Sequence, residues 1–246
     1  MKIHLLSRKE DLDPTRITDK VAVVFDVLFA TSTLVTVLAE GADGAYPVVG
    51  APAAMKLAEQ LPDAIVSGEW HADTLPGFAD PTPLALIKAG VRQRPLIYAT
   101  TNGTVALDSA SSAAATYAAA LVNAKAMAHH LLQRHASDTV LLICAGSSGA
   151  MNLEDMLGAG ACLSRLVDGA RKTKTPLALS DSAKIALLTY LGATEGGDME
   201  TALLATAIGQ LMHSRGLDAE MRAAADEDRY HGIAKLEQGC LRWQAI

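Results

Sequence analysis

Thr100-Thr101-Asn102-Gly103-Thr104 follows directly on the apolar run from Pro95 to Ala99 and precedes the helix-compatible residues Val105 to Leu107. This order predicts a buried strand, a turn and the start of a helix. Glycine permits backbone conformations that other residues resist, and the first turn of a helix leaves N–H groups without partners. Together with the threonine hydroxyls, these donors would suit an anion such as phosphate. The stretch is therefore our first candidate binding site.

Two other interpretations fit the same five residues. Asn-Gly is also typical of a tight hairpin, and threonine is an ordinary cap at the start of a helix. Only agreement with other turns of the chain can decide between an anion site, a hairpin and a cap.

The composition favours an α/β fold. The chain has 246 residues, enough for a large core, and is 50% hydrophobic but only 4% aromatic. Continuous apolar runs at Val21–Phe25 and Thr139–Ile143 are typical of strands covered on both faces, as in a parallel sheet. We expect a largely parallel sheet with helices on both faces and a final edge strand at Gly239–Trp243. The chain should form a single α/β unit over residues 1–246, subdivided near 120–138 or built from two intertwined subdomains.

Charge and cysteine content argue against several partners and locations. The formal net charge of -6 and the lack of a dense Lys/Arg run argue against nucleic-acid binding. The segment Val21–Ala39 has one charge, Asp26, but its β-branched residues and the interruption at Thr31–Thr33 favour a strand and a helix over a membrane span. The 3 cysteines form no CxxC pair, which fits a reducing, cytoplasmic location.

Polar residues follow the buried strands at several points. Asp26 comes directly after the first long apolar run, and Thr31-Ser32-Thr33 precedes a helix expected from about Leu34 to Glu40. Asp26 either contributes to chemistry or only caps the turn. Glu69 follows another short apolar run in the same way.

The second long apolar run ends in the small residues Cys144 to Gly149, and Glu154-Asp155 open the next helix. Because the carboxyl ends of parallel strands meet at one edge of a sheet, we expect all these groups to share a cleft. Hydroxyls, helix N-termini and spaced carboxylates together suit a phosphate with Mg²⁺, which prefers oxygen ligands and retains waters.

Several other chemistries are excluded by spacing. Cys144–Gly149 resembles the start of a cysteine-phosphatase loop, but Ala150 stands where its arginine would fall. Leu28 occupies the place of the second aspartate of an aspartyl-phosphate phosphatase. The chain has no GxGxxG after a strand, no GxxxxGK[ST] and no HExxH, so dinucleotide, P-loop and zinc-protease sites are not expected.

The motifs resemble, in order, those of the 2-phosphosulfolactate phosphatases, over roughly residues 21–166. The resemblance implies an α/β fold particular to that family and a Mg²⁺-dependent acid phosphatase that releases phosphate from 2-phospho-3-sulfolactate on the route to coenzyme M. The residues that carry the resemblance are Asp26 to Thr33, Gly68-Glu69, Gly77-Phe78, Thr100 to Thr104, Asn123, Cys144 to Gly146, Glu154-Asp155 and Ala159-Gly160.

Two positions depart from the family pattern. Phe29 stands where the family usually has arginine, and the loop Gly77–Pro83 differs from the family sequence. An arginine fork is a natural partner for a sulfonate or phosphate, whereas phenylalanine supplies neither charge nor donor. Two alternatives follow from these departures. Either the protein hydrolyses a different phosphate ester, or its activity is lost.

We predict a phosphomonoesterase that acts with Mg²⁺ on a small anionic hydroxy-acid phosphate. The candidate catalytic residues are Asp26, Glu69 and Asn102. The candidate metal ligands are Asp26, Glu69, Glu154 and Asp155. The candidate phosphate-binding residues are Thr31, Ser32, Thr33, Thr100, Thr101, Asn102, Gly103, Thr104 and Gly146.

Two rival functions belong to different classes. The first is a non-catalytic binder of a small acidic metabolite on the same fold, and Phe29 is the feature that favours it. The second is a protein whose alanine-rich helices serve mainly oligomer contacts. Apolar helices such as Ala202–Leu211 could also form a homodimer interface in an enzyme.

Overall fold

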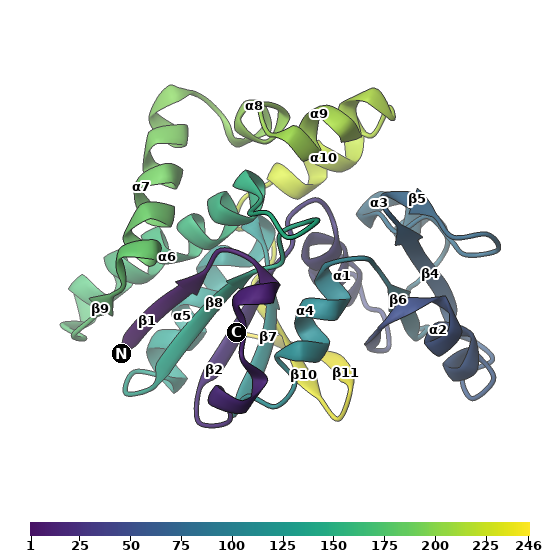
Figure 1. The fold of residues 1–246 in the computed structure, drawn as a ribbon, viewed down its shortest axis with the longest axis horizontal. Helices are drawn as coiled ribbons and strands as arrows, with labels where there is room; N and C mark the ends of the chain where they lie inside the picture. Colours follow the sequence, from purple (N-terminus) through teal and green to yellow (C-terminus); the bar gives the residue numbers. More distant parts are fainter.

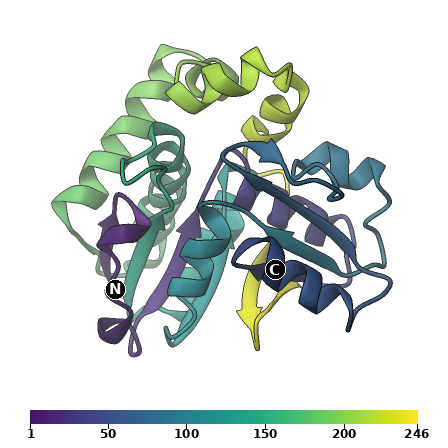
Figure 2. The same ribbon diagram turned by 45° about the vertical axis from the view of Figure 1, so that its right-hand side comes forward.

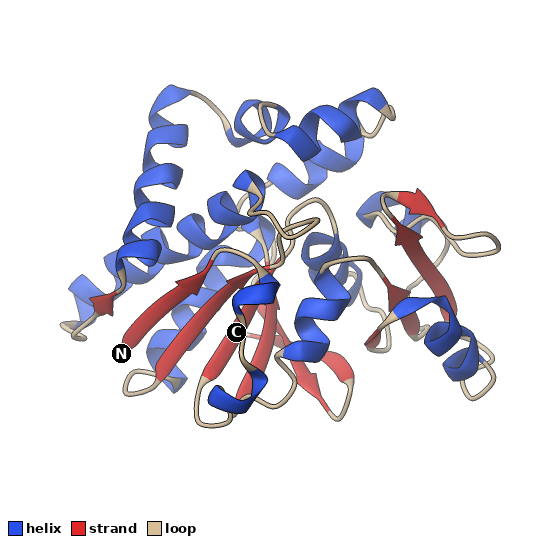
Figure 3. Cartoon of the chain, viewed as in Figure 1, coloured by secondary structure: helices blue, strands red, loops and turns tan.

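The computed structural model describes all of residues 1–246 as one eleven-stranded sheet with helices on both faces (Figures 1 and 3). The predicted α/β class with a mostly parallel sheet is confirmed. The order of strands across the sheet is β5 (Asp73–Thr74), β4 (Ile65–Trp70), β6 (Leu96–Ala99), β3 (Ala45–Val48), β11 (Cys240–Ala245), β10 (Gly232–Glu237), β7 (Ala115–Ala119), β2 (Val21–Phe25), β8 (Thr139–Cys144), β1 (Lys2–Leu6) and β9 (Ala178–Leu179).

Ten α-helices and three short 3-10 turns complete the fold. The helices are α1 (Ala30–Ala39), α2 (Gly50–Ala58), α3 (Pro83–Lys88), α4 (Gly103–Ser109), α5 (Ala124–Arg134), α6 (Leu153–Thr173), α7 (Asp181–Gly196), α8 (Met199–Leu204), α9 (Ala207–Ser214) and α10 (Asp218–Ala225). The 3-10 turns are η1 (Lys9–Asp11), η2 (Pro14–Arg16) and η3 (Leu121–Asn123). No helix is both long and apolar enough to cross a bilayer.

The sheet consists of two parallel blocks joined by an antiparallel hairpin. Strands β7, β2, β8, β1 and β9 form the larger block, and β4, β6 and β3 form the smaller one. The hairpin β10–β11 pairs with β7 on one side and β3 on the other. The prediction of an edge strand at Gly239–Trp243 is therefore wrong, because β11 lies near the middle of the sheet. A strand that comes last in the chain therefore need not lie at an edge of the sheet.

Strand β2 is buried on both faces, as its apolar run predicts. Val21, Val23 and Phe25 belong to the core beneath α5, α6 and α7, whereas Ala22 and Val24 belong to the core beneath α1 and α4. Because successive side chains of a strand point to opposite faces, one continuous apolar segment supports both layers of helices. The view in Figure 2 shows these layers on either side of the larger block.

Two helix boundaries differ from the sequence prediction. Helix α1 begins at Ala30 rather than near Leu34, so the three hydroxyl residues lie in its first turns. The helical segment after Asp198 is broken into α8 and α9, because the Thr206 hydroxyl accepts a hydrogen bond from the Gly209 N–H and starts a new helix.

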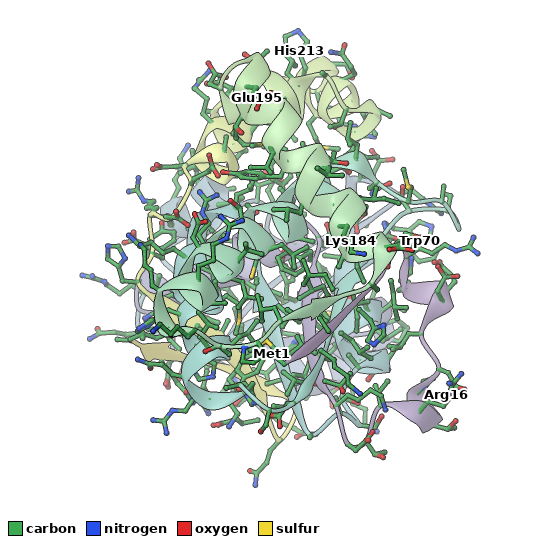
Figure 4. All side chains as sticks on the ribbon, turned by 90° about the vertical axis from the view of Figure 1, so that its left-hand side faces the viewer. Met1, Arg16, Trp70, Lys184, Glu195 and His213 are labelled. Carbon is green, nitrogen blue, oxygen red and sulfur yellow. The ribbon has the colours of Figure 1, made fainter.

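Helices α8 to α10 lead from the end of α7 towards α3, at the edge of the molecule where the β2 strand ends (Figure 1). Figure 4 shows Glu195, near the end of α7, and His213 of α9 at the end of the molecule opposite Arg16. The expected subdivision near residues 120–138, a range that holds η3 and α5, stays a prediction.

Candidate active site

A cavity of about 530 Å³ lies where the ends of β2, β4 and β6 face the segment from α9 to α10. Five residues predicted for the site line it, although they come from three strands in two different blocks of the sheet. They are Asp26, Glu69, Thr100, Thr101 and Asn102.

Gly103 allows the two blocks to meet. A Cβ atom at this position would lie 2.5 Å from the Ala30 Cβ and 2.7 Å from Oδ2 of Asp26. Any other residue would therefore push the start of α4 away from Asp26. The glycine is required for this close approach, and residues 103–109 form a helix, which rules out the hairpin interpretation.

Glu69 holds the turn after β6 against β4. The Thr101 N–H donates to Oε1 of Glu69 at 2.6 Å, and the Thr101 hydroxyl donates to Oε2 at 3.0 Å. The Ala72 N–H also donates to Oε2, at 2.6 Å. Both carboxylate oxygens of Glu69 are thus engaged by the protein.

Thr100 and Thr104 cap each other. The Thr104 N–H donates to the Thr100 hydroxyl oxygen at 3.2 Å, and the Thr100 N–H donates to that of Thr104 at 3.1 Å. Both residues are buried. The cap interpretation is therefore right for these two threonines, while the N–H groups of Asn102 and Gly103 form no hydrogen bond within the protein.

Lys9 was not predicted and supports the same turn. Its Nζ donates to Oδ1 of Asn102 at 2.9 Å and to the Ala145 carbonyl at 3.3 Å, and it forms an ion pair with Glu10 at 3.0 Å. A lone lysine in the polar connection after β1 carries no sequence signal that points to a turn 93 positions away.

Among the cavity acids that are not solvent-exposed, only Asp26 has an oxygen without a protein partner. Its Oδ1 accepts a weak hydrogen bond from the Ala30 N–H at 3.4 Å, and its Oδ2 accepts none. Burial, followed by the negative charges of Glu69 and Glu154, raises the pKa of Asp26 to about 7.

Each remaining cavity acid accepts at least one hydrogen bond from the protein, although the exposed residues Asp73 and Asp80 each keep one oxygen without a protein partner. Asp73 pairs with Arg215, and Asp80 accepts from the Thr74 hydroxyl. Glu220 of α10 accepts from the Thr82 hydroxyl at 2.8 Å and from the first N–H groups of α3. Glu220 attaches α10 to α3, and Arg215 attaches the end of α9 to the segment of β5; neither residue stands in a pattern that would have selected it from the sequence.

The hydroxyls of Thr31, Ser32 and Thr33 face the interior instead of the cavity. All three residues are fully buried and none lines the cavity. Thr31 donates to the Asp26 carbonyl, Ser32 to the Val27 carbonyl at 2.8 Å, and Thr33 to the Pro81 carbonyl at 3.2 Å. Because α1 starts earlier than expected, these hydroxyls satisfy backbone carbonyls and hold the turn after β2.

Glu154 and Asp155 are also buried away from the cavity lining. Asp155 accepts hydrogen bonds from the Val27 N–H at 2.9 Å and the Gly146 N–H at 3.0 Å, so it ties together the ends of β2 and β8. Burial raises the pKa of both carboxyls, and the Asp26 charge raises that of Asp155 further. Gly146 donates its N–H to Asp155 and therefore does not offer it to a ligand.

The four predicted metal ligands do not form one cage, since no three His, Cys, Asp or Glu side chains are close enough together to hold a metal ion. The cavity nevertheless fits a divalent cation. Its charged lining comprises one guanidinium and the carboxyls of Asp26, Glu69, Asp73, Asp80 and Glu220. A phosphate dianion would be repelled from this lining without a cation, and Mg²⁺ commonly binds through one or two carboxylates, waters and the substrate phosphate. Asp26, with a free oxygen, suits that mode.

A sequence model described as 2-phosphosulpholactate phosphatase matches residues 6–239. The chain belongs to the 2-phosphosulfolactate phosphatase family. The resemblance in the sequence is thus confirmed, and it extends into the C-terminal third, well beyond residues 21–166.

Curated relatives support the same family. A protein of Deinococcus radiodurans named probable 2-phosphosulfolactate phosphatase is 35% identical over 231 residues, which cover 93% of this chain and 92% of the relative. Proteins of the same name from Symbiobacterium thermophilum and Carboxydothermus hydrogenoformans are 39% and 37% identical, over 63% and 75% of this chain and 67% and 74% of their own lengths. The chain is accordingly a phosphatase, and nothing in these similarities favours the non-catalytic binder.

Proposed function

We propose that this phosphatase hydrolyses 2-phosphosulfolactate or a related hydroxy-acid phosphomonoester with the help of Mg²⁺. The observation that carries the proposal is the free Oδ2 of Asp26, a residue that lines an acidic cavity. Beside it are Asn102, which also lines the cavity, and Gly103, and the backbone N–H groups of these two residues have no protein partner. A carboxylate for a cation and N–H donors for phosphoryl oxygens are the two elements that phosphate-ester hydrolysis needs.

Mg²⁺ bound at Asp26 would supply Lewis-acid activation of the phosphate ester. Asp26 would hold the cation, while Glu69 and Lys9 fix the turn that carries the donors. The N–H groups of Asn102 and Gly103 are proposed to donate to the phosphoryl oxygens, where charge develops as the ester bond breaks. Glu154 and Asp155 act behind Asp26: the Glu154 charge raises the Asp26 pKa, and Asp155 fixes the turn that follows Asp26.

A cytoplasmic location and a place on the route to coenzyme M remain proposals based on the family resemblance. The three cysteines are free and buried, which agrees with a reducing compartment. A homodimer formed through the α8–α9 region also remains a proposal.

Phosphate release from 2-phosphosulfolactate, 2-phospholactate and phosphoglycolate, each with Mg²⁺ and with EDTA, tests the function. We expect release from at least one ester with Mg²⁺ and none with EDTA. Asp19→Asn is a matched control for Asp26→Asn, because Asp19 is an exposed residue paired only with Lys20. Absence of metal-dependent release from all three esters would contradict the proposal.

A further inference from the structure

The cavity that holds Asp26 also has a continuous apolar wall. Leu28, Phe29 and Met212 belong to one hydrophobic cluster, against which Ile208 and Leu217 pack, and all five line the cavity. Two of them directly follow the turn of Asp26, and the others come from α9 and the segment after it. A ligand whose phosphate lies at Asp26 would therefore have apolar side chains next to its remaining part.

The size of the cavity exceeds what a three-carbon acid needs. Its volume of about 530 Å³ lies within the range of about 300–1,000 Å³ that drug-sized ligands occupy. Apolar side chains exposed to such a cavity gain free energy only when an apolar group of the ligand covers them. A sulfonate or a second phosphate against this wall would lose hydration without gaining a partner.

Arg215, which follows α9, supplies the only guanidinium of the cavity lining. Its Nη1 donates to Oδ1 of Asp73 at 2.7 Å and to the Ala72 carbonyl. Its Nε and Nη2 form no hydrogen bond with the protein, and the side chain is 33% exposed. A guanidinium with two neighbouring free donors is suited to bind a carboxylate through both oxygens.

We infer that the preferred substrate is a hydroxy-acid phosphate with a branched aliphatic or aromatic group on its carbon chain. The apolar group lies against Phe29 and Met212, the carboxylate is bound by Arg215, and the phosphate lies at Asp26. The inference rests on the proposed phosphatase function and specifies its substrate class.

A pair of probes that differ only in the apolar group tests the inference. 2-Phospho-3-phenyllactate and 2-phospholactate share the phosphate and the carboxylate, and only the first has a phenyl ring. Since full burial of an apolar side chain is typically equivalent to about tenfold to hundredfold in an equilibrium, we expect kcat/KM to be at least about tenfold higher for the phenyl ester. An equal or lower value for the phenyl ester, with clear turnover of phospholactate or 2-phosphosulfolactate, would overturn the inference and leave the phosphatase function intact. No release from any of these esters would overturn both.

Substitutions in the apolar wall test whether this wall causes the preference for the phenyl ester. Phe29→Arg should remove the advantage of the phenyl ester, measured as the ratio of kcat/KM for 2-phospho-3-phenyllactate to that for 2-phospholactate. Phe29 is only 9% exposed, so a second variant guards against misfolding: Leu211→Asn, at a cavity residue that is 39% exposed, should reduce the same advantage. A phenyl preference that survives in both folded variants would show that this wall does not bind the ring.

Arg215→Gln tests the carboxylate contact separately. We expect KM for 2-phospho-3-phenyllactate to rise about tenfold with little change in kcat. KM for 2-phenylethyl phosphate, which lacks the carboxylate, should stay within about twofold. A similar rise for both esters would mean that Arg215 only braces the Asp73 loop, and the carboxylate assignment would fall.

Discussion

The turn after β2 and the turn after β6 look alike in sequence, yet they use their polar groups differently. After β2 the three hydroxyls are buried on backbone carbonyls and the acid, Asp26, keeps a free oxygen. After β6 the threonines bind each other or Glu69, and two backbone N–H groups are left free. In both turns the hydroxyl groups form hydrogen bonds within the protein. The groups available for a ligand are those without a protein partner, namely one oxygen of Asp26 and the N–H groups of Asn102 and Gly103. The comparison teaches that unsatisfied groups, rather than polar residue types, identify this site.

Removal of the free acid should have the largest effect. Asp26→Asn is expected to lower kcat/KM at least about 1,000-fold, because the variant lacks the anionic oxygen proposed to hold the cation. The same change should raise the melting temperature at pH 8, because it removes a buried charge that lies near Glu69 and Glu154. Phosphate-release kinetics and thermal melts of Asp26→Asn and Asp19→Asn check both results. If Asp26→Asn kept more than a tenth of wild-type activity, the free carboxylate after β2 would not be the group on which activity depends.

The second-largest effect is expected when the close approach between the turns after β2 and β6 is lost. Gly103→Ala places a Cβ 2.5 Å from the Ala30 Cβ, so the start of α4 must move away from Asp26. We expect destabilisation of about 1–3 kcal/mol and a fall in kcat of about 100-fold, since small displacements of reacting groups are costly. Chemical denaturation and single-turnover kinetics measure the two effects. Unchanged activity would show that the donors after β6 do not have to lie against Asp26.

The raised pKa of Asp26 predicts how the stability of the metal-free protein depends on pH. Its folded-state pKa of about 7 lies above its ordinary value of 3.8, so the folded protein retains a proton that the unfolded chain has lost. Stability in EDTA should therefore fall as the pH rises from about 4 to about 7 and then change no further through this group. Glu69→Gln should lower the Asp26 pKa and move the upper end of this window to lower pH. Thermal melts across the pH range check this, and an unshifted window would mean that Glu69 does not influence Asp26.

The smallest effects are expected at the buried hydroxyls. Thr33→Val and Ser32→Ala each remove one hydrogen bond to a backbone carbonyl, so each should lower the free energy of unfolding by about 1 kcal/mol. Their kcat/KM values should remain within about threefold of the wild type. A drop of about 100-fold in kcat/KM with unchanged stability would instead assign these hydroxyls to phosphate binding, as the sequence alone suggested.

The sequence predicted the parts of the fold that depend on local pattern. The both-face burial of β2 and the position of the turn after β6 were readable from apolar runs and breaks. Strand β10 was missed, and the hairpin's central place was not predictable, because the lateral order of strands depends on long-range pairing that the local sequence pattern does not encode.

The candidate site was only partly readable for a related reason. Asp26, Glu69 and Asn102 could be selected because they stand next to strand ends. Lys9 and Arg215 could not, since each reaches its partner over a long stretch of chain and lies in an ordinary polar context. Asp155 follows the rule for acids at a helix start, but its oxygens turn to the backbone of two strand ends instead of the cavity.

The most direct test of the account is a calorimetric titration of Mg²⁺ into the wild-type protein and into Asp26→Asn at pH 8. If Asp26 is the acid that is free to hold a cation, the wild type should bind Mg²⁺ and the variant should lose most of this binding while it remains folded. Equal binding by both proteins would place the cation elsewhere, and would contradict the central role given to Asp26, the one cavity acid that is not solvent-exposed and has an unpaired oxygen.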